Sequence, residues 1–563
     1  MKQKIGLIVN GALVSKQIND LVELASLAQN YEITTLIVNN TEYQTNLFKK
    51  LFEDFQKRGV SRLISNILFR AICKLEKTIL AKKLKYRHLY DQFDLTKYNF
   101  DIITVSPQIS KSGLIYRYSD SDLEKIRKAG LNLLVRSGSG ILKGEILTIC
   151  PNGIISFHHA DNNINRGGPP GFWEVYKQNP KTGFIIQRLT DELDGGDVLY
   201  KGFIRTSWFY SLNLANLYEI SNPFMHKALE NITSDAPSLS LYPKSPYSYQ
   251  LYKNPKVRES IYYLFKTVDI FLSKKIREIL GIKNRWGIAY QFTENWMDAV
   301  LWRSKKITNP KNRFLADPFV IKRNNKHYCF VEDFDYSINR GGISVYEITK
   351  EGYKELGSVL KEDFHLAYPY LFEYDGELYM CPETAEKRDI RIYKCLEFPL
   401  KWEFHKKIMS DVSAADTAIF FYEDKWWLIS NIDKSIVGEH FSQLHLFYNS
   451  NPLNTDWVAH SNNPIIFDPL KARNGGLIVD NTGTYRVYQR QGFDAYGKAL
   501  GVAKIISMDK KNYSEKSLFE VEPDFFSNIK GAHTYNYADG LLVFDYAKIS
   551  NKRTGISSDI AKN

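Results

Sequence analysis

The sequence is poor in cysteine and lacks any long apolar run. Its five cysteines are odd in number and irregularly spaced, which argues against a disulfide framework. No Cys-x-x-Cys pair occurs, so no structural metal site is expected, and reduced thiols in a cytoplasmic protein are the simple interpretation. No uninterrupted apolar run reaches roughly 18 residues, so no membrane-spanning helix is expected. The short apolar run after the basic start predicts a buried strand, because no small-residue cleavage site of a signal peptide follows it.

Positive charge and aromatic side chains are, by contrast, abundant. The 75 lysines and arginines outnumber the 63 acidic residues and give a formal net charge of +12. This charge favours anionic partners such as nucleotides, phosphates or lipid head groups, although a lysine-rich genome would produce the same excess. A nucleic-acid partner is not expected. Aromatic residues make up 14% of the chain and gather in its second half, which is typical of many short strands.

Alternating strand-like and helix-like segments fill the first part of the chain. Apolar runs occur at residues 4–11, 101–106, 131–138 and 153–159, with amphipathic segments between them. This alternation predicts a doubly wound, Rossmann-like α/β domain with a parallel sheet. The first strand-to-helix turn lacks the Gly-x-Gly-x-x-Gly pattern, so an ordinary dinucleotide-binding site is not predicted.

After about residue 285 one strand–turn–strand plan recurs. Each copy has a polar opening, an apolar strand, a turn rich in Gly, Asp, Asn or Lys, and an aromatic strand. The openings recur roughly every 50 to 60 residues, the size of one propeller blade. Five copies predict an all-β, five-bladed β-propeller, with a β-sandwich as the alternative. The copies lie at residues 316–333, 367–384, 415–432, 474–491 and 532–548.

The composition predicts three parts: an α/β domain at residues 1–230, a linker at 231–285 and the propeller at 286–563. The linker contains a basic amphipathic segment at residues 256–280, and a similar segment interrupts the first domain at residues 57–87. Each segment could lie on an anionic membrane surface or pack its apolar face on its own domain. We therefore expect a cytoplasmic protein and leave open a peripheral contact with the inner face of the membrane.

One stretch, residues 131–199, combines histidines, glycine–proline turns and an acidic turn beside apolar strands. Its motifs are SFH (156–158), RGGPPGFW (166–173), TGFII (182–186) and DGGDVL (194–199). In this order they resemble the formyltransferase family that uses 10-formyltetrahydrofolate and acts on methionyl-tRNA, glycinamide ribonucleotide or amino sugars. The resemblance covers about residues 1–230.

The resemblance implies roles for individual residues. His158 corresponds to the catalytic histidine of the family and Asp194 to its catalytic aspartate. Ser156 stands where the family has an asparagine, and its shorter hydroxyl donor would need a water to reach the oxyanion of the tetrahedral intermediate. The resemblance places the folate pocket at Arg136, Ser137, Gly138, Gly140, Ile141, Leu142 and Asp191. It places acceptor-binding positions at His159, Asp161 and Arg166, although Arg166 would equally suit a loop-holding role.

The second half resembles the N-terminal domain of plant glucosamine inositolphosphorylceramide transferases, through FLADPFVI, FVEDFD, HLAYPYLF, YMCPE and ADTAIF. It is also similar to five-bladed glycoside hydrolases of arabinanase type, which place acidic residues on inner strands. Such residues would bind the hydroxyls of a glycan, hydrolyse it as paired carboxylates, or only join neighbouring blades. The positions concerned are Asp317, Glu332, Glu383, Asp416, Arg473 and His533.

Together these features predict an enzyme that transfers a formyl group. The donor would be the co-substrate 10-formyltetrahydrofolate, and the acceptor the amine of a nucleotide- or lipid-linked amino sugar used for a surface glycan. Methionyl-tRNA is disfavoured because the chain after residue 230 does not resemble the small barrel of tRNA formyltransferases. Two alternatives stay open: a carbohydrate-processing enzyme with a degenerate formyltransferase domain, and a non-catalytic protein that binds a glycan at the propeller.

Overall fold

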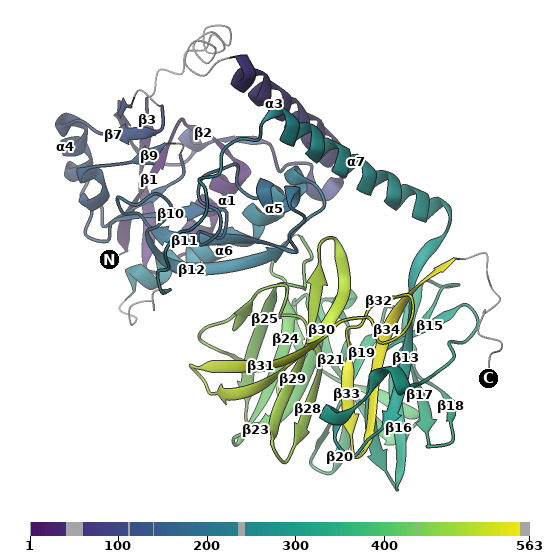
Figure 1. The fold of residues 1–563 in the computed structure, drawn as a ribbon. Coiled ribbons are helices and arrows are strands. Elements are labelled where there is room, and N and C mark those ends of the chain that lie inside the picture. The colour runs from purple at the N-terminus through teal and green to yellow at the C-terminus, as the bar shows by residue number, and fades with distance from the viewer. Residues whose placement is uncertain are drawn as a thin grey trace. The chain divides into compact units, whose positions relative to one another are not determined.

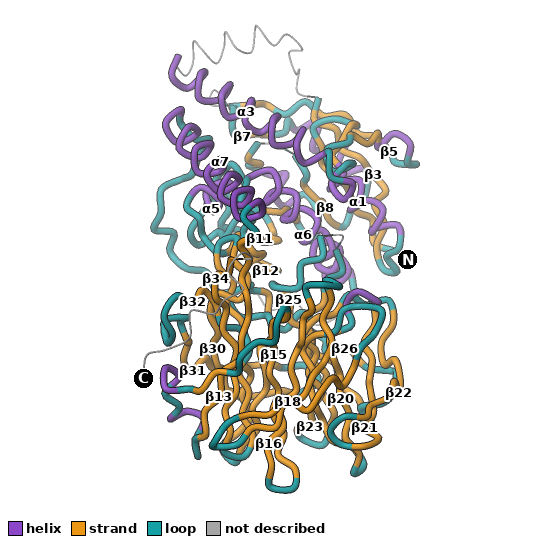
Figure 2. The backbone as a smooth tube through the Cα atoms, turned by 90° about the vertical axis from the view of Figure 1, so that its right-hand side faces the viewer, coloured by secondary structure: helices purple, strands orange, loops and turns teal. Residues whose placement is uncertain are grey.

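The computed structural model describes residues 2–40, 60–110, 113–138, 140–234, 242–435 and 437–551. The chain forms two compact units, Met1–Ile270 and Phe271–Asn563 (Figure 1). The division falls inside one long helix, α7 (Val257–Ile279). Figure 2 shows that helices belong mainly to the first unit and that strands dominate the second. The start of the amphipathic segment 57–87, before residue 60, lies outside the described residues.

A seven-stranded sheet forms the centre of the first unit, in the order β12–β11–β10–β8–β1–β3–β5. Neighbours from β10 to β5 are parallel, whereas β11 runs antiparallel to both β10 and β12. The inner strands are nearly continuous apolar runs because a parallel sheet is covered on both faces. The strands are β1 (Gln3–Val9), β3 (Tyr31–Asn39), β5 (Asp101–Val105), β8 (Leu133–Arg136), β10 (Ile154–His158), β11 (Lys181–Arg188) and β12 (Asp197–Arg205).

Helices pack on this sheet through their apolar faces. Leu123 and Ile126 of α4 join a core with Ile8, Ile37 and Leu134, while α1 and α6 contact each other and β3. The helices are α1 (Lys16–Ser26), α3 (Val60–Ala81), α4 (Asp120–Lys128), α5 (Phe172–Tyr176) and α6 (Tyr210–Thr233). Short strands are β2 (Leu13–Ser15), β4 (Gln92–Asp94), β6 (Gln108–Ile109), β7 (Ile115–Arg117) and β9 (Ile141–Leu142).

Antiparallel sheets make up the second unit, and four of them are formed by consecutive strands. These are β15 (Arg313–Arg323) to β18 (Tyr353–Leu360), β19 (Ala367–Tyr374) to β22 (Lys401–Ser410), β23 (Ala414–Tyr422) to β27 (Ile466–Phe467), and β28 (Asn474–Asp480) to β31 (Tyr513–Val521). Their middle strands are β16 (Lys326–Asp335), β17 (Arg340–Ile348), β20 (Glu377–Glu383), β21 (Asp389–Glu397), β24 (Lys425–Ile432), β25 (Gln443–Asn449), β26 (Val458–Ala459), β29 (Gly483–Gly492) and β30 (Ala495–Met508).

A fifth sheet joins the two ends of this unit. In it β13 (Ile282–Phe292) pairs with β34 (Leu541–Asn551), and β14 (Lys305–Lys306), β32 (Ile529–Gly531) and β33 (Tyr535–Ala538) complete it. The first strands touch in succession: β15 contacts β19, β19 contacts β23, β23 contacts β28, β28 contacts β33, and β33 contacts β15. Each of the five sheets thus contacts the next, and the last contacts the first.

The structure therefore contains an α/β unit followed by an all-β unit, as the sequence predicts. Among the described residues, no helix has the length and apolar character needed to cross a membrane. All five cysteines are free.

Candidate functional site

His158 is the last residue of β10, at the carboxyl end of a strand that runs parallel to β8. Its side chain is buried; Nε2 lies 2.9 Å from the backbone carbonyl oxygen of Asn165, and Nδ1 lies 3.4 Å from Oδ1 of Asp194. A carbonyl oxygen only accepts hydrogen bonds, so Nε2 carries the proton in this contact. Nδ1 is therefore the nitrogen that can take up a further proton, and the carboxylate of Asp194 faces it.

Asp194 sits in the turn between β11 and β12 with a positive φ of 49°. Its Oδ2 accepts a hydrogen bond of 3.0 Å from the backbone N–H of Gly167, so the aspartate ties the Arg-Gly-Gly stretch to the histidine. Steric crowding requires glycine at one position in each of the two motifs, RGGPPGFW and DGGDVL. A Cβ on Gly196 would lie 2.1 Å from the carbonyl oxygen of Arg188, and one on Gly167 would lie 2.3 Å from that of Tyr252.

Two further residues that the sequence did not single out support the histidine. The side-chain amide of Asn165 donates to Oε1 of Glu174 at 2.9 Å, and both side chains are buried. Burial raises the pKa of Glu174, although the amide and His158 oppose this. The pair holds the backbone carbonyl that fixes Nε2. Glu174 could have been noticed as a lone acid in the apolar segment FWEVY.

Ser156 shares a face of β10 with His158, because side chains alternate along a strand. It is buried, and its hydroxyl donates to the carbonyl oxygen of Phe157 at 3.2 Å. Its register partner on β11 is Gln187, also buried, whose Oε1 accepts from the N–H of Gly196 at 3.2 Å. A glutamine amide thus stands opposite the serine that replaces the asparagine of the formyltransferase pattern.

Six of the seven residues predicted to bind folate lie at the end of β8, in the loop after it and in β9, whereas the seventh, Asp191, lies between β11 and β12. Arg136 donates to the carbonyl oxygen of Gly140, and the N–H of Ser137 donates to that of Ile8 at 2.9 Å. Gly138 packs on Asn10, and Gly140 packs on the ring of Tyr116. Leu142 is buried and Ile141 half-buried in β9, whereas the side chain of Asp191 is 79% exposed and pairs with Lys143.

Of the three predicted acceptor-binding residues, Asp161 and Arg166 lie near one cavity, whereas His159 lies apart from it. His159 points to α1 and α6, where Nε2 lies 3.2 Å from Gln17 Nε2 and 3.2 Å from Ser221 Oγ. Burial lowers the pKa of His159 to about 3, with a smaller contribution from His158. Asp161 forms an ion pair with Lys201.

Arg166 lies next to the Asp194 turn, at a cavity of about 140 Å³. Its Nη1 is 2.5 Å from Oε1 of Glu192, its Nε donates to the carbonyl oxygen of Asn162 at 3.0 Å, and its guanidinium lies over the ring of Tyr247. The cavity is also lined by Lys201, Lys244, Gly195 and Gly196. It therefore joins cationic side chains to the turn that carries Asp194.

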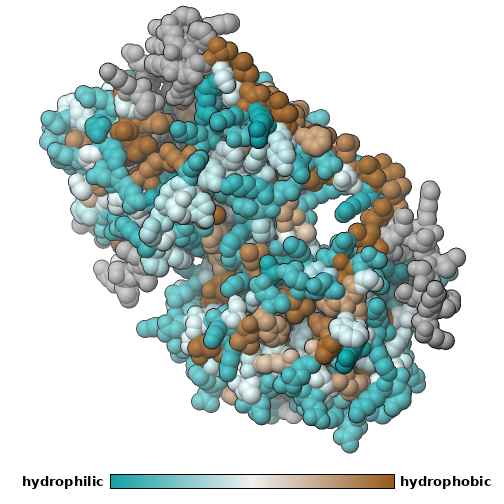
Figure 3. Space-filling model, in the orientation of Figure 1, coloured by the Kyte–Doolittle hydropathy of each residue, from teal (hydrophilic) through white to brown (hydrophobic). Residues whose placement is uncertain are grey.

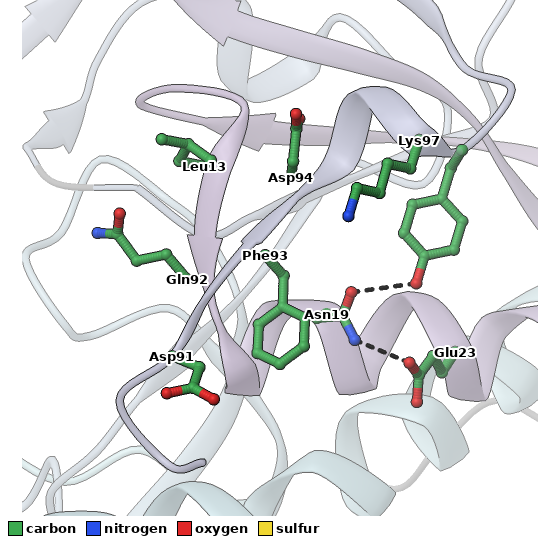
Figure 4. A pocket seen from close by; sticks show the side chains of 9 residues that line it. Leu13, Asn19, Glu23, Asp91, Gln92, Phe93, Asp94 and Lys97 are labelled. Atoms are coloured by element: carbon green, nitrogen blue, oxygen red, sulfur yellow. Dashed lines mark hydrogen bonds between the residues drawn. The ribbon is translucent and has the colours of Figure 1, made fainter.

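A larger cavity, of about 590 Å³, lies elsewhere in the first unit (Figure 4). It contains none of the predicted site residues. Asn19, in its wall, donates to Glu23 at 2.8 Å and accepts from the hydroxyl of Tyr98 at 3.0 Å. Because these polar groups satisfy one another, we do not assign a function to this cavity.

In the second unit, the six predicted polar residues form one cluster. Arg473 Nε lies 2.7 Å from Oδ2 of Asp416, and its Nη2 lies 3.7 Å from Glu383. His533 Nε2 lies 3.9 Å from Oδ1 of Asp317. Glu332 lies 3.6 Å from His365 and close enough to the neighbouring carboxylates for its pKa to respond to them.

In three of the five copies, the polar opening is a β-bulge on the first strand of the sheet. The register shifts after Ala316, Ala367 and Ala415, and the next residue in each copy has a positive φ: 48° at Asp317, 46° at Tyr368 and 51° at Asp416. Bulges re-aim side chains beside functional sites, and positive φ in a non-glycine residue costs about 1–3 kcal/mol. The backbone is therefore strained at Asp317 and Asp416, which contribute two carboxylates to the cluster.

Burial and mutual repulsion perturb the carboxylates of this cluster. The pKa of Glu332 is well above its usual value because it is buried and because Asp317 and Glu383 lie close. Burial also raises the pKa of Asp416 well above the usual range, although Arg473 opposes the shift. Burial lowers the pKa of His533, but the carboxylates of Asp545 and Asp317 outweigh it, so the net shift is upward. The cluster therefore favours a protonated carboxyl beside a charged imidazolium.

Two members of the cluster were missed by sequence reasoning. Asp545, on β34, lies 2.5 Å from His533 Nδ1 and accepts from the N–H groups of His533 and Thr534. The ring of Trp286 stacks on the imidazole with centroids 3.8 Å apart. Ligand atoms of Asp317, His533 and Asp545 lie within 4.8 Å of one another, a spacing that could hold a metal ion. Since hydrogen bonds already engage these carboxylates, we assign no metal there.

Comparisons with known proteins cover parts of the chain. A family model described as the N-terminal part of glucosamine inositolphosphorylceramide transferase 1 matches residues 298–552, less than half of the chain. The Arabidopsis thaliana protein of that name is 32% identical over 257 residues, 42% of this chain and 33% of its own length. The chain thus spans about a third of the length of this curated relative.

Formyltransferases are also similar to the chain. Methionyl-tRNA formyltransferase of Bacillus subtilis (strain 168) is 26% identical over 191 residues, 34% of this chain and 58% of that enzyme. A solved phosphoribosylglycinamide formyltransferase from Bacillus halodurans covers 42% of this chain and 97% of its own, with 11% identity and a TM-score of 0.28. Both curated relatives are transferases by name, and they represent the two families that the sequence motifs resemble.

Proposed function

We propose that the first unit transfers a formyl group from 10-formyltetrahydrofolate to the amine of an amino sugar that carries phosphate, in the cytoplasm. The observation that carries this proposal is the pair of His158 and Asp194, 3.4 Å apart at the carboxyl end of β10. The sequence motifs and the similarity to a formyltransferase support the reaction class, and the donor would bind at the end of β8, against the loop of Gly138 and Gly140.

The geometry suggests how His158 acts. The backbone carbonyl of Asn165 holds the Nε2 proton, so Nδ1 accepts the proton that the attacking amine loses, and Asp194 stabilises the imidazolium formed. The imidazolium would then return this proton to N10 of the folate as the C–N10 bond of the tetrahedral intermediate breaks and tetrahydrofolate leaves. Donors near the oxyanion of the tetrahedral intermediate come from Ser156 and, across the register, from Gln187. One well-placed donor of this kind is worth about 10²–10³ in rate.

The acceptor would enter beside Arg166. That residue, Lys201 and Lys244 line the cavity next to the Asp194 turn, where Lys201 is paired with Asp161 and Lys244 with Asp197. Glu192, whose side chain is 55% exposed, forms an ion pair with Arg166. It can move into solvent when a phosphate binds Arg166 in its place. The phosphate of an amino sugar linked to a nucleotide or to a lipid would take the place of Glu192 beside Arg166.

For the second unit, we propose a five-bladed β-propeller that binds a glycan. The closed succession of contacts among β15, β19, β23, β28 and β33 supports the ring, and the buried acidic cluster supports contacts with sugar hydroxyls. A second candidate, glycan processing at this cluster, is favoured by Glu332, because a carboxyl with a raised pKa beside another carboxylate suits general acid catalysis.

Folate dependence tests the first proposal. The full chain is incubated with 10-formyltetrahydrofolate and a panel of amino-sugar nucleotides, with methionyl-tRNA as a competing acceptor, and products are weighed by mass spectrometry. A formyl mass gain on one amino sugar is expected, and His158→Ala should lower its rate by about 10²-fold or more. Unchanged turnover in that variant would refute the role of His158.

The second candidate has a separate readout. Hydrolysis or transfer of a glycan needs no folate and should fall in Glu332→Gln while the formyl transfer of the first unit persists. If the chain forms no formylated product and binds no folate, but Glu332→Gln abolishes glycan turnover, the second candidate replaces the first.

A further inference from the structure

Helix α3 carries apolar side chains on two opposite faces. Its inner face buries Phe69, Ile72 and Leu80. Its outer face repeats apolar residues at helical spacing, and each side chain on it is 48–56% exposed. An amphipathic helix that only covered its own domain would need the first face alone. The outer residues are Val60, Ile64, Ile67, Leu75 and Ile79.

The first half of α7 has the same property. Tyr263 is buried and donates to Oε1 of Glu76 on α3, whereas the residues on the other side of the helix are 36–70% exposed. Figures 1 and 2 both draw α3 and α7 next to each other, and Figure 3 shows hydrophobic side chains along the line they follow. We call the two outer faces the helix-pair surface. Its α7 residues are Ile261, Leu264, Phe265 and Val268.

Basic residues accompany this surface. On α3, Arg70, Lys74 and Lys77 are exposed, and the only acid in the helix, Glu76, is buried. Directly after α3, Lys82 and Lys83 are exposed and precede Leu84, which is 83% exposed. On α7 the charges are mixed, with Arg258 and Lys266 beside Glu259 and Asp269. The α3 side of the surface is therefore cationic.

We propose that the helix-pair surface docks on an anionic lipid bilayer. Apolar side chains would enter the interface, while lysines and arginines meet the head groups. A second copy of the chain is the less suitable occupant, because two cationic α3 faces would repel each other. None of the residues on this surface belongs to either proposed site, so variants of the surface test docking separately from catalysis.

Vesicle flotation tests the proposal with the full chain. Phosphatidylcholine vesicles containing about one third phosphatidylglycerol are compared with pure phosphatidylcholine vesicles. Binding to the anionic vesicles only is expected, and it should weaken with salt. The double variant Ile64→Ser/Phe265→Ser should bind at least about tenfold more weakly. Lys74→Gln and Lys82→Gln should each cost about fivefold.

A matched control removes apolar side chains of similar exposure elsewhere. Phe421 and Val479, 56% and 64% exposed in the second unit, are changed to serine together, and this variant should bind like the wild type. Circular dichroism checks that each variant is folded. Absence of flotation, or equal binding by the two double variants, overturns the proposal. So does a dimer, seen by light scattering, that Phe265→Ser dissociates while vesicle binding is absent.

Discussion

His159 follows His158 in the chain but lies in a different chemical environment. His158 faces a carboxylate, whereas His159 stacks on Phe157 with ring centroids 5.0 Å apart and contacts Gln17 and Ser221, two neutral side chains. Adjacent residues of a strand end thus point to opposite sides of the sheet, one toward the proposed reaction site and one toward the packing of α1 and α6.

We expect His159 to stay neutral far into the acid range, because burial lowers its pKa to about 3. The unfolded chain has a histidine pKa of about 6.5, so the folded state loses stability as the pH falls from about 6.5 toward about 3, by at most about 1.4 kcal/mol per pH unit. NMR titration of the imidazole resonances measures the pKa of His159, and the His159→Gln variant identifies its resonance. A midpoint near 6.5 for this ring would contradict the expectation.

Arg473 is the countercharge of a buried carboxylate. Changing it to methionine removes the countercharge of Asp416 and leaves it the amide of Gln489, and the loss of one member of a buried ion pair costs about 3–5 kcal/mol. The thermal unfolding temperature of the second unit should fall accordingly and recover in part in Arg473→Met/Asp416→Asn. The control is Arg490→Met, whose partners Glu520 and Glu522 are exposed and whose loss should cost about 1 kcal/mol or less. Equal losses in both variants would refute the assignment.

Close contact between strands of neighbouring sheets in the second unit requires glycine, which has no side chain, at some positions. A Cβ on Gly475 of β28 would lie 2.2 Å from the carbonyl oxygen of His533, where two sheets meet. Gly475→Ala should destabilise the second unit by about 1–3 kcal/mol, because the clash is with backbone that cannot move aside. Gly352→Ala, in an open hairpin turn with nothing within 4 Å, is the control. Calorimetry compares the unfolding temperatures of the two variants. Equal unfolding temperatures would argue against a close contact at β28.

The elements that could be predicted are those whose sequence pattern is local. Strands β1, β8 and β10 are apolar runs, and the repeated hairpins of the second half carry their turns in the sequence. The antiparallel return of β11 could not be predicted, because pairing direction depends on the whole sheet. The β-bulges could not be predicted either, because the only sign of the extra residue in the sequence is the polar opening.

The candidate sites follow the same rule. His158 and Asp194 could be found because motifs mark them, and Asp317 and Asp416 because the repeat marks them. Asn165 and Asp545 could not, because each acts through a hydrogen bond that only the folded chain forms, and Glu174 is marked in the sequence only as a lone acid in an apolar segment. Asp545 in particular lies inside the strand LLVFDYAK, where the sequence gives no reason to separate it from a buried acid of purely structural use.

The integrity of the second unit depends on its last long strand. β34 pairs with β13, β32 and β33, so residues near the end of the chain hold the start of the unit. Val543 is fully buried in this strand, and Val543→Asp would place a carboxylate between β13 and β33, at a cost of several kcal/mol. We expect limited proteolysis to degrade residues 271–551 of this variant, while the first unit, which has its own core, survives as a stable fragment.

The control is Val479→Asp, at a position 64% exposed, which should resist proteolysis like the wild type. Loss of both units together would show that they fold as one, and survival of both would show that the unit does not depend on β34.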